Sequence, residues 1–230
     1  MRKLPRVYIS VAAFLLFASL AAYPAIIYLK KFDFNDDNAL KRWGRMILNG
    51  QVKYLLIKAG SNGYVEALSE KTCSALYYRI GFKLRDYPIL TWKWKVMKFP
   101  DKSNAKDEKA RDDYAARVYV IFPFLSFSSS KFIEYVWSEE MPAQTVMKSP
   151  NGDNIRLIVV RSGREGAGQW FFESRNVYND YLKAFGREPG LNVGAVAIMC
   201  DADGTKSEAE ALFDDIAIGN EAESRRLAEK

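Results

Sequence analysis

Charged side chains inside a strand-like segment are the residues of this chain best placed for chemistry. Residues 111–122 read RDDYAARVYVIF, which is rich in β-branched and aromatic residues but also holds Asp113 and Arg117. The two-residue period of a strand would put one set of side chains on a common face: Asp113, Ala115, Arg117, Tyr119 and Ile121. The other face, from Tyr114 to Phe122, is apolar and is expected to face the core.

Two later segments have the same mixed character. In FIEYVWS (132–138), Ile133, Tyr135 and Trp137 share a face, and in IRLIVVRS (155–162) an apolar run precedes Arg161. If these faces line up across a sheet, they form a concave surface of aromatic rings with convergent charges. Such a surface suits sugar rings, which stack on aromatic side chains while their hydroxyls bond to polar groups. The predicted ligand-binding residues are Asp113, Arg117, Tyr119, Tyr135, Trp137 and Arg161.

A structural role is the alternative for the same residues. Buried guanidinium groups need partners whether or not a ligand is bound, so the sequence favours internal ion pairs for Arg117 and Arg161, with ligand contact as the second role. Trp92 and Trp94 lie in LTWKWKVM (90–97), where lysines alternate with them, and are therefore expected to pack in the core.

The chain has no histidine in its 230 residues. Histidine-based triads and histidine zinc sites are therefore excluded. Any hydrolysis would have to rest on carboxylates from distant strands, as in glycosidases. The adjacent acids Glu139-Glu140 and Asp214-Asp215 point to opposite sides of a strand, so no catalytic residue is assigned. A carboxylate-dependent glycan hydrolase or lyase remains the enzyme alternative.

No cofactor or metal site is assigned. Glycine loops that cradle phosphate are missing, and DADGT (201–205) lacks the later ligands of a calcium loop, which favours a turn that ends a strand. A structural cation at Asp214 or Asp215 remains an alternative. Cys73 and Cys200 fall in predicted strands, and both a disulfide and two separate buried thiols are compatible with the sequence.

Most of the net charge of +6 lies in the first 31 residues, which hold five basic side chains and no acid. The rest is close to neutral, without the basic stripe that nucleic-acid binding requires, so no nucleic-acid partner is expected. Residues 7–29 carry no charge. A helix of that length could cross the roughly 30 Å hydrocarbon core.

The amino-terminal segment predicts export in either of two ways. Basic residues before residue 7 favour a cytoplasmic start and a single-pass anchor with the domain outside. Alternatively, it is a signal peptide cleaved near Ser19-Leu20-Ala21 and the domain is released into the periplasm. We therefore divide the chain into an anchor or signal (1–31), a β domain (32–219) and a charged tail (220–230).

Short strand patterns follow from residue 32 onward. YLLIKA (54–59) and YVEALS (64–69) flank GSNG, a hairpin signal, and about ten such runs occur before residue 219. One helix is predicted over 177–186, with Gly186 as its cap. The fold class is all-β: an antiparallel β-sandwich of the jelly-roll type with one short helix.

Several of these segments carry a resemblance to a known family. They are FDF (32–34), SALYYRI (74–80), PILTWKWKV (88–96), RDDYAARVYVIF (111–122), EYVWS (134–138), RLIVVRSG (156–163), WFFESRNVYNDYLKAFG (170–186), AIMCDADGT (197–205) and FDDIAIG (213–219). On these blocks the chain resembles a bacterial domain-of-unknown-function family, DUF3047. The resemblance implies an exported protein and brings no established activity. FDDIAI also looks like the last strand of jelly-roll carbohydrate-binding modules, a fold-level analogy.

Together these observations predict an exported, membrane-anchored domain that binds a glycan or another envelope polymer without catalysis. The alternatives are the carboxylate-dependent enzyme and a structural domain that binds a protein partner of the cell envelope. The oligomeric state is not predicted.

Overall fold

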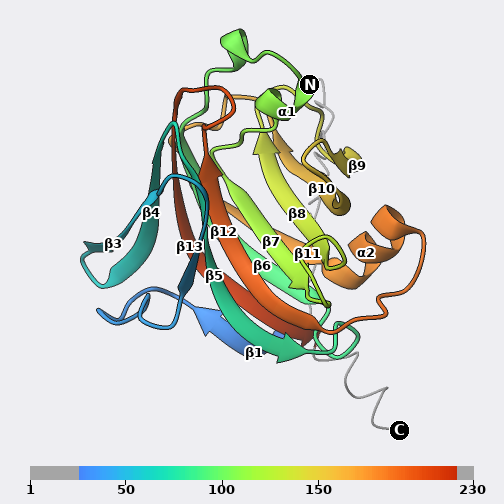
Figure 1. The fold of residues 1–230 in the computed structure, drawn as a ribbon. Helices are drawn as coiled ribbons and strands as arrows, with labels where there is room; N and C mark the ends of the chain where they lie inside the picture. The colour runs from blue at the N-terminus through green and yellow to red at the C-terminus, as the bar shows by residue number, and fades with distance from the viewer. Residues whose placement is uncertain (1–25, 222–230) are drawn as a thin grey trace, which may run out of the picture.

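Two β-sheets packed face to face make up most of the structure (Figure 1), a computed structural model that describes residues 26–221. Two α-helices and one 3₁₀-helix lie in the connections. The elements are β1 (Ile26–Phe32), β2 (Gly44–Asn49), β3 (Lys53–Ala59), β4 (Asn62–Glu70), β5 (Cys73–Phe82), β6 (Ile89–Lys98), η1 (Lys102–Asn104), α1 (Glu108–Arg111), β7 (Arg117–Phe122), β8 (Lys131–Ser138), β9 (Val146–Ser149), β10 (Gly152–Ser162), β11 (Phe171–Asn176), α2 (Val177–Phe185), β12 (Val193–Asp201) and β13 (Glu208–Glu221).

The six-stranded sheet has the order β11-β6-β13-β4-β3, with β1 also paired to β13. The seven-stranded sheet has the order β2-β5-β12-β7-β8-β10-β9. All described pairs are antiparallel except β8 with β10. This parallel pair corrects the all-antiparallel prediction. It arises because β9 runs back in the direction opposite to β8 at the sheet edge, and the chain then turns into β10, which lies between them and so runs in the direction of β8.

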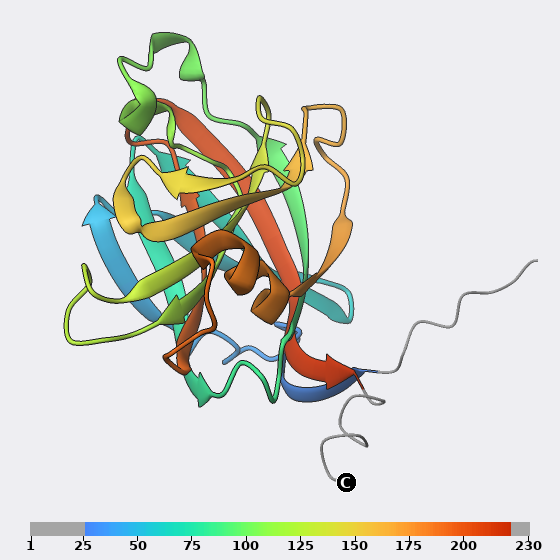
Figure 2. The same cartoon turned by 90° about the vertical axis from the view of Figure 1, so that its right-hand side faces the viewer.

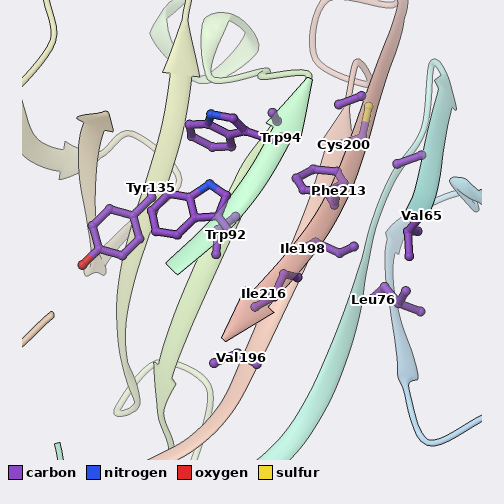
Figure 3. Packing of buried hydrophobic residues seen from close by; sticks show 14 of the residues in the cluster. Val65, Leu76, Trp92, Trp94, Tyr135, Val196, Ile198, Cys200, Phe213 and Ile216 are labelled. Atoms are coloured by element: carbon purple, nitrogen blue, oxygen red, sulfur yellow. The ribbon is translucent and has the colours of Figure 1, made fainter. Parts of the chain in front are cut away.

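The core lies between the sheets and is rich in aromatic rings (Figure 3). On β6, Trp92, Trp94 and Val96 are fully buried, as their alternation with Lys93 and Lys95 predicts. Tyr135 of β8 reaches across from the opposite sheet, with its ring centroid 5.3 Å from that of Trp92. This contact joins an interior strand of one sheet to an interior strand of the other.

Tyr135 and Trp137 are therefore core residues, and their predicted place on a ligand-binding face is wrong. Both side chains are completely buried, and the Trp137 Nε1 donates a hydrogen bond to the Gly163 carbonyl at 2.9 Å. The physical reason is that the face of β8 bearing Ile133, Tyr135 and Trp137 is the larger apolar face, so the sandwich buries it.

Helix α2 covers one open side of the sandwich (Figure 2). Its Val177 and Tyr181 belong to the core, the side chain of Asn176 accepts the hydrogen bond that caps its start, and Gly186 ends it with φ of 67°. The predicted helix and its glycine cap are confirmed. The hairpin of β3 and β4 around GSNG is confirmed as well.

A two-sheet, mostly β sandwich is also confirmed, but three strands were not predicted: β1, β2 and β9. The connection between β6 and β7 contains η1 and α1. The finer jelly-roll assignment stays a prediction.

Strand β1 changes the expected boundary after Lys31. Residues 26–29, assigned to an apolar spanning segment, pair as a strand with β13, so the described sandwich begins at Ile26 and ends at Glu221. A short apolar run of this kind is compatible with a strand as well as with a helix, and residues 26–29 form a strand that pairs with β13. Among residues 26–221, no helix has the length and hydropathy to cross a membrane. The anchor or signal predicted before residue 26, and the charged tail after residue 221, lie outside the described residues.

The burial of Trp137 gives a direct test of this arrangement. We expect Trp137→Ala to lower the free energy of unfolding by about 3–5 kcal/mol, because it removes a fully buried aromatic side chain. Phe172→Ala, at a ring that is 57% exposed, is the control and should change it by less than about 0.5 kcal/mol. Urea unfolding followed by far-ultraviolet circular dichroism measures both. Equal, small effects would contradict the core assignment.

Candidate functional site: an arginine-centred groove

The outer face of the seven-stranded sheet carries a cavity of about 470 Å³. Its floor is formed by outward-facing residues of β5, β7, β8 and β12, and its rim by β2, α1, the 123–130 loop and the turns after β9 and β12. The residues that line the cavity include Asp112, Arg117, Tyr119, Phe127, Glu134 and Asp201.

An apolar hollow of about 80 Å³ continues this cavity. The two share several wall residues, including Tyr119, Phe127 and Ile155. The hollow adds the apolar and aromatic side chains of Tyr77, Ile121 and Phe132. We call the two parts together the groove: it has a polar end around Arg117 and an apolar end around Phe132.

Strand alternation sets which side chains enter the groove. Arg117 lies opposite Met199 of β12 and Val136 of β8, and Tyr119 lies opposite Glu134. Val118, between them on β7, is fully buried in the core. The outward-facing residues of β7, β8 and β12 therefore meet around Arg117.

Arg117 is buried and uses its whole guanidinium group. Its Nε and Nη2 donate to the two carboxylate oxygens of Asp201 at 3.0 and 2.7 Å. Nη1 donates to Glu134 and, at 3.4 Å, to the Tyr119 hydroxyl, while Nη2 also donates to the Asp112 carbonyl. Such bidentate, charge-assisted contacts fix geometry as well as charge. We call Arg117, Asp112, Glu134 and Asp201 the Arg117 cluster.

Asp113 fixes the turn after β12. Its carboxylate accepts hydrogen bonds from the Thr205 amide at 2.7 Å, the Thr205 hydroxyl at 2.6 Å and the Gly204 amide at 3.3 Å. On the other side, Asp112 Oδ2 accepts from Ser149 at 2.9 Å and Asn151 at 2.8 Å. Together the two aspartates join the groove rim to the sheet.

Two carboxylate oxygens of the Arg117 cluster accept no hydrogen bond from any described residue. They are Glu134 Oε2 and Asp112 Oδ1, and both side chains are buried in the wall of the cavity. Buried acceptors of this kind carry a desolvation cost that a suitable donor would remove.

Burial also shifts the acidities of the cluster. It raises the pKa of Glu134, and it raises the pKa of Asp201 to about 8 although Arg117 opposes the shift. Burial works against the charge of Arg117, but Asp201 and Glu134 hold the pKa of that guanidinium well above its usual value. The arginine is therefore a fixed cation, and Glu134 and Asp201 are the groups of the cluster whose raised pKa favours proton uptake.

Of the predicted site residues, Asp113, Arg117 and Tyr119 lie together in the groove wall. Their predicted alternation along one strand is correct only from Arg117 onward, because β7 begins there and Asp113 is held by its bonds to the 204–205 turn. Ligand contact by these residues stays a prediction.

Arg161 is separated from Arg117, so the predicted common face is wrong. A register shift between Val159 and Arg161 breaks the alternation of β10, and Arg161 pairs with Trp137, a core-side residue. Its guanidinium carbon lies 3.5 Å from the centroid of the Phe171 ring, and it forms a 2.9 Å ion pair with Glu173 of the other sheet. Arg161 therefore has the structural role that the sequence left as its alternative.

The two cysteines lie on adjacent strands but on opposite faces. Cys73 lies opposite Asp201 and faces the groove, whereas Cys200 lies opposite Ser74 and belongs to the core between the sheets. Both are free thiols. The disulfide considered from the sequence does not form.

Cys73, Asp201 and Asp203 form the one described cluster whose geometry could hold a metal ion, with ligand atoms within 4.8 Å of one another. Both oxygens of Asp201 already bind Arg117, however, and burial raises the pKa of the Cys73 thiol. The guanidinium and a neutral thiol make this a poor cation site. Asp215, which the sequence offered as an alternative cation ligand, forms an ion pair with Lys93 at 2.6 Å. The DADGT segment contains a turn at residues 203–206, as predicted.

Sequence reasoning missed three members of the Arg117 cluster: Asp112, Glu134 and Asp201. Glu134 was detectable, because it is the only charged residue between Phe132 and Trp137 and lies on the face opposite Tyr135. Asp201 ends a continuous apolar run, 193–200. Pairing an acid in one apolar strand with an arginine in another would have predicted the cluster.

The family model described as "Protein of unknown function (DUF3047)" matches residues 41–217. The chain belongs to this family. The match covers the groove and both sheets except β1 and the end of β13, and it confirms the family resemblance noted in the sequence. Among curated proteins, none matches the chain.

Solved structures with a similar arrangement include three that share 10–11% identity with this DUF3047 chain. "Cellulose induced protein, Cip1" has a TM-score of 0.47 and aligns over 82% of this chain and 96% of its own. The xyloglucanase domain of NopAA, a type three effector from Sinorhizobium fredii in complex with cellobiose, has a TM-score of 0.45 and aligns over 77% of this chain and 93% of its own. A family 30 carbohydrate-binding module of a Clostridium thermocellum cellulase has a TM-score of 0.44 and aligns over 79% of this chain and 92% of its own.

The Arg117 cluster makes a clear stability prediction. Arg117→Met should lower the free energy of unfolding by about 3–5 kcal/mol, because it leaves buried carboxylates without their counter-charge. Arg117→Lys should recover only part of this, since an ammonium cannot reproduce the two parallel bonds to Asp201.

The control is Arg85→Met, which breaks an exposed ion pair with Glu188 and should leave stability nearly unchanged. Urea unfolding at pH 7 measures all three variants. Full retention of stability in Arg117→Met would contradict the role of this arginine as the centre of the cluster.

Proposed function

We propose that the groove binds a glycan or a related hydroxyl-rich polymer. The single observation that carries this proposal is the continuity of an aromatic, apolar end with an end that holds unpartnered carboxylate oxygens. A sugar ring has apolar faces that stack on aromatic side chains and hydroxyls that donate to carboxylates. The cavity volume of about 470 Å³ lies within the range of small-ligand sites, about 300–1,000 Å³.

Within the groove, we assign stacking to Phe127 and Tyr119 and hydrogen-bond acceptance to Glu134 and Asp112. Phe127 is 52% exposed at the rim, so a ligand can cover its ring, and it packs against Phe132 with ring centroids 4.9 Å apart. Arg117 acts indirectly. All its donors are engaged, so it positions Glu134 and Asp201 and does not itself contact the ligand.

The binding prediction is tested with a panel of envelope and plant polysaccharides and the purified full-length chain. We expect at least one glycan to bind, and Phe127→Ala to weaken its binding about tenfold, a typical loss for an aromatic stacking contact at a binding surface. Phe124→Ala is the matched control, because Phe124 is 56% exposed on the same loop but lies outside the groove.

Isothermal titration calorimetry measures each affinity. If no glycan on the panel binds, or if both variants behave alike, the proposed function is wrong. The absence of binding to every polysaccharide would favour the alternative in which the domain binds a protein partner.

A carboxylate-dependent hydrolase or lyase is the second candidate. Glu134 favours it, since this acid has a free oxygen in the cavity wall and burial raises its pKa, as in a general acid. In the same panel, release of reducing ends or unsaturated products that disappears in Glu134→Gln would select the enzyme. Binding without product release selects the binding domain.

We further propose that this domain works outside the cytoplasm. The proposal rests on the charge-free residues 7–29 and the basic residues before them, of which residues 1–25 lie outside the described structure. A carboxyl-terminal alkaline phosphatase fusion in a bacterial host is expected to be active, and the chain to stay in carbonate-washed membranes. An inactive fusion would contradict export. A mature chain that starts after Ala21 would select the cleaved-signal alternative.

A further inference from the structure

The polar end of the groove has an excess of negative charge. Five carboxyl groups line it (Asp112, Asp113, Glu134, Asp201 and Asp203), against two basic side chains, Lys109 and Arg117. Lys109 is exposed on α1, so only Arg117 contributes a buried positive charge. Ionised carboxylates in such a place are stabilised by an additional cation.

The existing hydrogen bonds do not balance this excess. Asp113 is satisfied by the neutral donors of Gly204 and Thr205, and Asp201 takes two of the Arg117 donors. Glu134 and Asp112 each keep one oxygen without a donor, although their side chains are only 1% exposed. An ionised carboxylate can only accept hydrogen bonds, so whatever completes these two residues must donate.

The same geometry decides between classes of sugar. An acidic sugar would bring a carboxylate next to five carboxyl groups, and Arg117 has no free donor to receive it. A neutral sugar could donate hydroxyls but would leave the charge excess in place. An amino sugar supplies both donors and a positive charge.

We infer that the groove selects a glycan that carries free primary amines, with one ammonium group bound at Glu134 and Asp112. This inference rests on the proposed glycan-binding function and names its ligand class. The remaining sugar rings then extend toward the apolar end, over Tyr119 and Phe127.

Proton uptake gives an independent signature. Burial brings the pKa of Asp201 to about 8, so this carboxyl group holds a proton in much of the protein at neutral pH. Burial also raises the pKa of Glu134. A bound ammonium favours the ionised carboxylates, lowers their pKa and releases protons. The other titratable groups that line the site are Cys73, Asp113, Tyr119, Asp203 and Lys109. Tyr114 also packs against it, with its ring centroid 4.8 Å from the Arg117 guanidinium carbon, and the Lys102–Glu139 ion pair lies behind that ring.

The test compares three hexasaccharides with the same β-1,4 backbone: one of glucosamine, one of N-acetylglucosamine and one of glucose. Calorimetry at pH 6 on the full-length chain should give at least tenfold tighter binding for the glucosamine hexamer. Repeating the titration in two buffers of different ionisation enthalpy should show net proton release. In about 0.5 M salt, the preference should shrink, because salt screens the charge that causes it.

Two variants test whether the preference for the glucosamine hexamer depends on the Arg117 cluster. Glu134→Gln keeps an oxygen that can accept from Arg117 but removes the negative charge, so the glucosamine hexamer should then bind no more tightly than the glucose hexamer. If this variant does not fold by circular dichroism, Asp112→Asn makes the same test. Asp153→Asn, at a side chain that is 95% exposed outside the groove, is the control and should keep the preference.

The outcomes separate this inference from the proposed function. Equal affinity for the three hexasaccharides, or a preference for the acetylated or glucose hexamer, would overturn the inference that the groove selects free amines. The proposal that the groove binds glycans would be unaffected. If none of the three binds and the polysaccharide panel is also silent, both are wrong. Spermidine binding as tightly as the glucosamine hexamer would overturn the glycan part of both.

Discussion

The buried positive charge of Arg117 is the interaction on which the rest of the site depends. It lies on β7, in the middle of the seven-stranded sheet, and binds carboxylates from β8 and β12 on either side. Removing a guanidinium and several carboxylates from water costs more than their attraction returns unless the geometry is close to ideal. The bidentate bond to Asp201 and the bonds to Glu134 and the Asp112 carbonyl provide that geometry. Their positions relative to one another are therefore fixed before any ligand arrives.

This constraint extends from the sheet to the loops. Arg117 holds Asp112 through its carbonyl, Asp112 holds Ser149 and Asn151, and the neighbouring Asp113 holds Thr205. Three connections that are far apart in sequence are thus tied to one strand, and they form the rim of the same cavity. A preformed rim lowers the entropy that binding must offset, which suits a site that recognises its ligand by hydrogen bonds.

Sequence patterns predicted the scaffold better than the site, for identifiable reasons. Trp92 and Trp94 alternate with lysines, so only one face of β6 could be buried. In β8 nearly all residues on both faces are buried, so the pattern could not show that Tyr135 and Trp137 face the core. Arg161 was misplaced by a register shift in β10 that leaves no mark in composition. Arg117 was found because a charge in an apolar strand is conspicuous, but its partners come from β8 and β12 and required the topology.

The placement of the two thiols also bears on how the chain reaches its native state. Cys73 and Cys200 lie on neighbouring strands with their side chains directed to opposite surfaces of one sheet, so no rotamer change can bring the sulfurs together. Folding of the sandwich needs neither a thiol oxidant nor an isomerase to reshuffle wrong pairs. No disulfide stabilises the described domain, so reducing agents should leave its fold intact.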